Sequence, residues 1–132
     1  MREIKFRAWD KKKKKMYSDN NWPNCWFLWL DGSIWSIPDE HTLNIDSQAK
    51  DVNMSKDFIL MQYTGLKDKN GKKIYEGDIL SYELKQGWEI FFEDGCYYMM
   101  CDNDSYLLEK IRAMISKVIG NIYENPELLE KK

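Results

Sequence analysis

The sequence predicts a mainly β fold, a small barrel or meander of short antiparallel strands with one or two short helices toward the C-terminus. Apolar and charged residues alternate at the N-terminus, turn-forming pairs containing glycine recur between apolar runs, and aromatic residues make up 14% of the 132 residues. Period-two alternation indicates half-buried strands, and short strands separated by regular turns are typical of small barrels. We expect residues 1–132 to form a single domain.

The N-terminal stretch REIKFRAW predicts the first strand, with Ile4, Phe6 and Ala8 on its buried side. Met16 and Tyr17 begin the return strand. The lysine run 11–15 then lies in a hairpin loop, where we expect all five side chains to be exposed and without fixed partners.

The most apolar segment, NWPNCWFLWLDGSIWSI, predicts two strands at about 25–30 and 33–37 around an Asp31-Gly32 turn. Alternation places Trp26 and Trp29 on opposite faces of the first strand. One chain then covers both faces, or one face meets a partner. We favour a homo-oligomer, most simply a dimer, with a candidate protein interface at Trp26, Trp29 and Trp35.

A long loop or short helix is expected from Pro38 to Ser55, and DFILMQYTGL then predicts a further strand. Turns are expected at Asn70-Gly71, Gly77-Asp78, Gln86-Gly87 and Asp94-Gly95, with short strands between them. The core residues expected in this half of the chain are Ile79, Phe91 and Ile122.

Near the C-terminus, apolar residues recur at the spacing of a helix face, at Leu107, Leu108, Ile111, Met114 and Ile115. A strand is expected over 118–123. Asn125 suits the N-cap of a second short helix, and Pro126 suits its first position.

Three stretches, MREIKFRAWDKKKKKMY, LMQYTGLKDKNGKKIYEGDIL and VIGNIYENPELL, in this order resemble the YopX-like proteins of bacteriophages and prophages. The resemblance implies a small, mainly β protein that is encoded by phages of Gram-positive bacteria and resides in the host cytoplasm. It implies no catalytic residue, cofactor or ligand.

The balanced charge, −2 overall, argues against a surface devoted to nucleic acid. Two segments are basic, however. Residues 1–17 carry eight basic and two acidic side chains, a net +6, and residues 67–75 carry four and one, a net +3. If the two loops converge, they form a candidate nucleic-acid patch of Lys11, Lys12, Lys13, Lys14, Lys15, Lys67, Lys69, Lys72 and Lys73.

Metal binding, a cofactor and catalysis are not expected. The spacing of Cys96 and Cys101 does not suit zinc, and the only histidine, His41, is distant in sequence. The odd number of cysteines and the lack of an export signal indicate reduced thiols in the cytoplasm. No apolar run approaches the ~18 residues of a membrane span.

The function expected from the sequence is therefore that of a non-enzymatic phage accessory protein that acts by protein binding or self-association. The alternative is a small β-barrel that binds nucleic acid through the lysine-rich loops 11–15 and 67–73.

Overall fold

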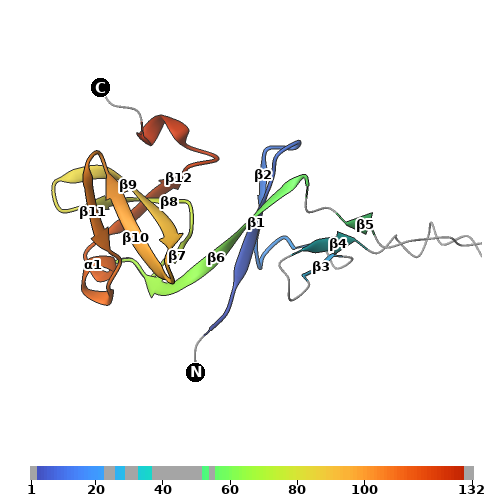
Figure 1. Ribbon diagram of the computed structural model, residues 1–132, viewed down its shortest axis with the longest axis horizontal. Coiled ribbons are helices and arrows are strands. Elements are labelled where there is room, and N and C mark those ends of the chain that lie inside the picture. The colour runs from blue at the N-terminus through green and yellow to red at the C-terminus, as the bar shows by residue number, and fades with distance from the viewer. Residues whose placement is uncertain (1–2, 23–25, 29–32, 37–51, 54–55, 130–132) are drawn as a thin grey trace, which may run out of the picture. The chain divides into compact units, whose positions relative to one another are not determined.

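The computed structural model describes residues 3–22, 26–28, 33–36, 52–53 and 56–129. These residues form mainly antiparallel strands, with one short α-helix and one 3-10 helix near the C-terminus, which confirms the predicted fold class (Figure 1). By its contacts the chain divides into two compact units. Unit 1 comprises Met1–Phe6 and Met61–Lys132, and unit 2 comprises Arg7–Leu60.

Unit 2 contains the two hairpins expected in the N-terminal half. Strand β1 (Phe6–Asp10) pairs with β2 (Lys15–Tyr17), so that Ala8 faces Tyr17 and Asp10 faces Lys15. A second sheet has the order β3-β4-β5. Its strands are β3 (Trp26–Leu28), β4 (Ile34–Ser36) and β5 (Val52–Asn53). The Asp31-Gly32 turn and nearly all of the segment between Pro38 and Ser55 lie outside the described residues.

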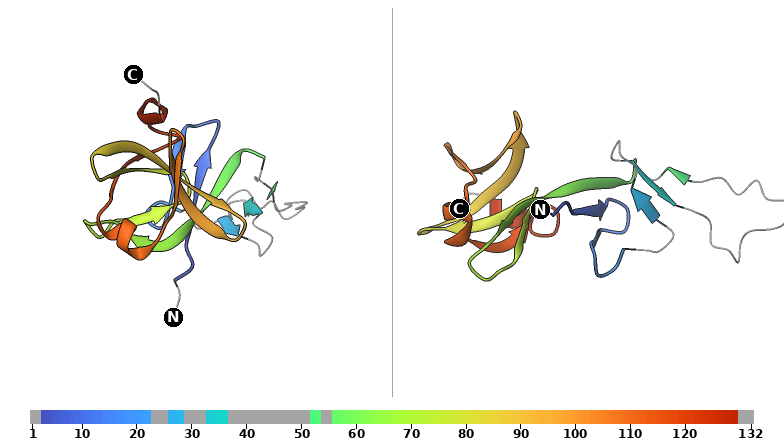
Figure 2. Two further views of the ribbon diagram at one scale, coloured as in Figure 1. Left: turned by 60° about the vertical axis from the view of Figure 1, so that its left-hand side comes forward. Right: turned by 90° about the horizontal axis from the view of Figure 1, so that it is seen from below.

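Unit 1 is built on a five-stranded sheet of order β11-β10-β9-β8-β12, which curls into a half-barrel (Figures 1 and 2). The first four of these strands in sequence form a meander, and the last returns to pair with β8. Their bounds are β8 (Asp78–Tyr82), β9 (Lys85–Glu93), β10 (Cys96–Cys101), β11 (Asp104–Leu107) and β12 (Lys117–Asn121).

The remaining elements border this sheet. Strand β6 (Phe58–Lys67) starts in unit 2 and continues into unit 1, where it pairs with β7 (Lys73–Tyr75). Helix α1 (Lys110–Met114) follows β11, and the 3-10 helix η1 (Pro126–Leu129) follows β12. In unit 1, α1 and η1 lie toward opposite ends of the curled sheet (Figure 1).

Most of the predicted turns are confirmed. Gly71 and Gly77 have positive φ values of 80° and 83°, and both residues of the Asp94-Gly95 turn have positive φ, as a two-residue hairpin turn of the I′ type requires. The turn predicted at Gln86-Gly87 is wrong. Gly87 lies inside β9 at a register shift, and the chain instead reverses at Glu83, which has φ 55°.

The core of unit 1 lies on one face of the curled sheet. Its buried residues are Ile74, Leu80, Trp88, Ile90, Met99, Cys101, Leu108, Ala113 and Val118. Burial of the predicted core residues Ala8 and Ile79 is confirmed, since both are fully buried.

Four other core predictions are wrong or only half right. Ile4 is 64% exposed, because it precedes the first residue of β1. Phe6, Phe91 and Ile122 are half-buried. Period two puts Phe91 with Glu89 and Glu93, on the face of β9 opposite Trp88 and Ile90.

The C-terminal region agrees with the prediction in outline. A short helix is present at α1 and a strand at β12, but β11 was not expected. Only Leu108 of the five apolar residues at helical spacing is buried. At η1 the Asn125 side chain accepts a hydrogen bond from the backbone N–H of Asn121, 3.3 Å away.

Candidate binding surfaces

One face of α1 carries large apolar side chains into solvent. Ile111, Met114 and Ile115 are 72%, 56% and 53% exposed. Their spacing of three and four residues places them side by side on a helix surface, and we call them the α1 patch. The small residue Ala113 faces the core and is 1% exposed. The helix is therefore inverted relative to the usual amphipathic pattern, in which the largest apolar residues are buried.

Contacts at both ends of α1 hold it in this orientation. Before the helix, Leu108 is buried, and its N–H donates to the Tyr97 carbonyl at 2.9 Å. From within the helix, Arg112 donates to the Leu107 carbonyl at 3.0 Å and lies 5.0 Å from the centre of the Tyr106 ring. After the helix, the fully buried Ser116 accepts a hydrogen bond from the N–H of Lys69.

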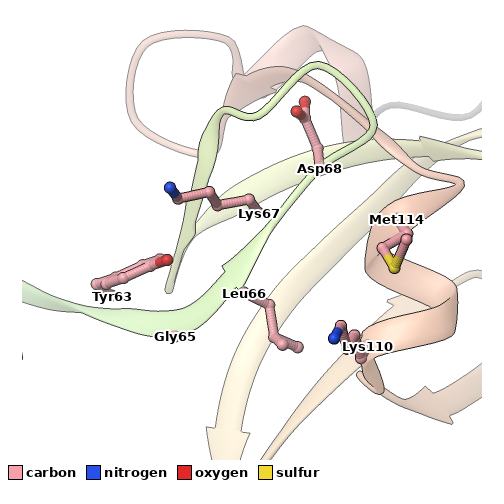
Figure 3. A pocket seen from close by; sticks show the side chains of 7 residues that line it. All are labelled: Tyr63, Gly65, Leu66, Lys67, Asp68, Lys110 and Met114. Carbon is pink, nitrogen blue, oxygen red and sulfur yellow. The ribbon is translucent and has the colours of Figure 1, made fainter. Parts of the chain in front are cut away.

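A pocket of about 270 Å³ adjoins the α1 patch. It lies between β6 and α1 and is lined by Tyr63, Gly65, Leu66, Lys67, Asp68, Lys110 and Met114 (Figure 3). Met114 belongs both to the pocket and to the α1 patch. Leu66, Lys110 and Met114 gather on one side of the pocket, and Tyr63 and Lys67 lie on the other.

Three charged residues line the pocket, the two lysines Lys67 and Lys110 and the carboxylate of Asp68. Lys67 and Lys110 are both exposed, and among the described residues neither has an ion-pair partner. The Asp68 carboxylate, in contrast, is occupied. One oxygen accepts the N–H groups of Asn70 and Lys72, and the other accepts that of Val118, all at 2.9 Å.

Burial of Asp68 opposes its ionisation, but these three backbone N–H groups outweigh that effect and hold the pKa of the carboxyl below its usual value. Asp68 is therefore a structural anion. It joins the turn after β6 to the start of β12 and so shapes one wall of the pocket.

The predicted interface at Trp26, Trp29 and Trp35 stays a prediction. Trp26 and Trp35 lie on the paired strands β3 and β4, where Trp26 faces Ser36 and Phe27 faces Trp35 in the register. Trp29 lies outside the described residues.

The lysine loop of unit 2 is exposed, as predicted, but two of its side chains have fixed partners. Lys11 donates to the Lys56 carbonyl at 3.1 Å, and Lys12 lies 3.3 Å from an oxygen of Asp57. Lys15 sits 5.0 Å from the centre of the Tyr17 ring. The expectation of a loop without fixed partners is therefore wrong for Lys11 and Lys12.

The second lysine group, Lys67, Lys69, Lys72 and Lys73, belongs to unit 1, whereas residues 11–15 belong to unit 2. Lys73 is engaged with Glu3, 3.4 Å away, and with the ring of Tyr63. The nucleic-acid patch that would combine both groups stays a prediction.

Neither of the two described cysteines forms a disulfide, and Cys96 is exposed whereas Cys101 is buried. The Cys101 thiol donates to the Gln86 carbonyl at 3.5 Å. Within the described part of the chain, no three His, Cys, Asp or Glu side chains gather as metal ligands would. Of the helices described, none has the length and apolar character needed to cross a membrane.

The half-barrel of unit 1, with its meander and short C-terminal helices, defines a class of small β proteins. The sequence model of the YopX protein family matches residues 5–130, and the chain belongs to this family.

Two solved structures share this architecture. Protein EF1440 from Enterococcus faecalis is 29% identical, with a TM-score of 0.65 over 98% of this chain and 100% of that one. Protein yopX from Bacillus subtilis is 21% identical, with a TM-score of 0.60 over 98% of this chain and 100% of that one. No curated protein matches the chain.

The sequence placed the apolar residues of the α1 patch at the spacing of one helix face but did not indicate whether that face is buried or exposed. A sign of the true arrangement was available. The apolar residues of this short helix are interrupted by charged residues, Glu109, Lys110 and Arg112. A helix of one turn with charged residues among its apolar ones has no wide polar face to turn toward solvent. The pocket had no sequence signal, because β6 and α1 are far apart along the chain.

Proposed function

We propose that this chain is a non-enzymatic accessory protein of a phage or prophage that acts in the host cytoplasm by binding protein through the α1 patch. The observation that carries the proposal is the exposure of Ile111, Met114 and Ile115 on one helix face. Clustered exposed apolar side chains mark surfaces that a partner covers. Binding of this kind needs no catalytic group or cofactor, and the resemblance to phage proteins supports the phage setting.

The contacts that fix α1 also support this function. A helix of five residues is not stable by itself, so its orientation depends on Leu108, Arg112 and Ser116. These contacts preorganise the apolar face before a partner arrives, and preorganisation reduces the entropic cost of binding.

The proposal is tested by comparing proteins retained from bacterial host lysate by immobilised wild type, by Ile111→Ser/Ile115→Ser and by Leu84→Ser. Leu84 is a matched control, since its side chain is fully exposed at the β8–β9 turn. We expect a protein that is retained by wild type and Leu84→Ser and lost with the α1 variant. An identical set of retained proteins for all three would overturn the proposal.

A further inference from the structure

Unit 1 carries a second exposed feature whose chemistry complements the pocket. The β9–β10 turn lies at the end of a long hairpin (Figure 2). There Phe92 is 52% exposed, and its ring meets the Tyr97 ring edge-on, with 5.1 Å between the ring centres. The next two residues, Glu93 and Asp94, are exposed. We call Phe92, Glu93 and Asp94 the hairpin tip.

The tip and the pocket have opposite charge and similar apolar character. Among the described residues, the carboxylates of Glu93 and Asp94 have no ion-pair partner, just as Lys67 and Lys110 have none. The lining of the pocket also includes the apolar side chains of Leu66 and Met114. A cavity of about 150 Å³ holds a benzene ring, so the pocket, at about 270 Å³, has room for a phenylalanine ring.

None of the residues that line the pocket comes from the β9–β10 turn, so the tip does not fill the pocket of its own chain. Both features are present on every copy. We infer that the β6–α1 pocket receives the hairpin tip of a second copy of this chain, with Phe92 between Leu66 and Met114 and the two carboxylates beside Lys67 and Lys110.

This inference rests on the proposed function and names its partner. Two copies that exchange tips make the contact twice, and a twofold axis then closes the assembly as a dimer. The tip is a tight turn, since Asp94 and Gly95 form a two-residue turn with both φ values positive. Docking beside Met114 would also cover part of the α1 patch.

The experiment measures the mass of the purified full chain by light scattering between about 1 and 100 micromolar. The pocket variant is Lys67→Glu/Lys110→Glu. The tip variant is Glu93→Lys/Asp94→Asn, in which asparagine keeps the positive φ of position 94 accessible. The matched charge controls are Lys117→Glu and Glu124→Lys, two exposed residues of unit 1 outside both features. Thermal unfolding of each variant establishes that it is folded.

We expect the wild type and both controls to dimerise, and each of the two variants to associate at least tenfold more weakly. An equimolar mixture of the two variants should recover dimers. In that mixture the acidic pocket meets a basic tip, and the unchanged pocket meets an unchanged tip. Phe92→Ser should weaken association without changing net charge.

A monomeric wild type at 100 micromolar would overturn the inference, as would a mixture that fails to recover dimers. If association persists unchanged in both variants, the tip and pocket are not the contact. The lysate comparison with Ile111→Ser/Ile115→Ser then decides separately whether the α1 patch binds another protein.

Discussion

The carboxylate of Asp68 joins two stretches of unit 1 that are 50 residues apart in sequence. It is 6% exposed and accepts three backbone hydrogen bonds. An amide at this position offers only one acceptor oxygen and turns an N–H₂ group toward backbone donors. We expect Asp68→Asn to lower the free energy of unfolding by about 1–3 kcal/mol at neutral pH, because the single amide oxygen leaves the buried N–H of Val118 without an acceptor.

The effect should depend on pH. Folding lowers the pKa of Asp68, so its contribution to stability is complete above the pKa of about 3.9 of an unfolded aspartate. That contribution is lost as the pH falls through the lower pKa of the folded state. The free energies of unfolding of wild type and Asp68→Asn, measured with urea, should therefore approach each other as the pH falls below about 4. A constant difference between the two proteins from pH 7 to pH 3 would contradict this assignment, and the exposed Lys69→Gln provides the control.

At the scale of elements, the β1–β2 hairpin depends on Asp10 more than on its lysines. The Asp10 side chain is 5% exposed and accepts the N–H groups of Lys12 and Lys13 at 2.9 and 3.0 Å. Lys14 completes the reversal with φ 55°. The lysines are exposed, and the path of the loop is fixed by its backbone and by the Asp10 carboxylate.

We therefore expect Asp10→Ala to destabilise the protein by about 1–2 kcal/mol, since two backbone donors lose their acceptor. Lys13→Ser should change stability by less than about 0.5 kcal/mol, as exposed positions usually do. Chemical denaturation of the two variants against wild type measures both values. A larger loss in Lys13→Ser than in Asp10→Ala would show that the lysines stabilise the hairpin.

Elements with strict alternation or an unambiguous turn were predictable from sequence. Asp94-Gly95 is one such case, because a tight turn with two positive φ values favours this pair. The turn predicted at Gln86-Gly87 was wrong because glycine is common both in turns and at β-bulges, so the sequence does not distinguish the two. The exposure of the α1 patch could not be predicted for a different reason. Helical spacing shows which side chains share a face but not whether that face is buried, and the decision comes from β11 and β12 on either side.

At the scale of the whole molecule, the hydrophobic core cluster of unit 1 lies on one face of its sheet. Ile90 and Phe91 are neighbours on β9 but face opposite sides. Ile90 is 1% exposed in the core, whereas Phe91 is half-buried and stacks on Tyr98 at 5.6 Å. Substitutions at Ile90 and Phe91 therefore compare how much the two faces of the sheet contribute to stability, within a single strand.

Ile90→Ala should lower the free energy of unfolding by about 2–5 kcal/mol, because it removes buried methyl groups and leaves a cavity. Phe91→Ala should lower the free energy of unfolding by less than Ile90→Ala does. The Phe91 substitution removes more atoms, but part of the Phe91 ring is already exposed to water. Denaturation curves of the two variants provide the comparison. The reverse order would place Phe91 in the principal core, as its apolar character alone had predicted.

The sheet order also bears on how the chain is synthesised. Strands β8 to β11 are joined by short turns, so this meander has low contact order and can form as soon as residue 107 has left the ribosome. The edge of β8 that pairs with β12 then stays unpaired until β12 is synthesised. In the folded chain Lys117 pairs with Ser81 and Asn121 pairs with Asp78. Until residues 117–121 emerge, that edge offers unpaired backbone groups to any other nascent strand. A chain interrupted in this interval is therefore expected to aggregate more readily than one that ends a few residues later.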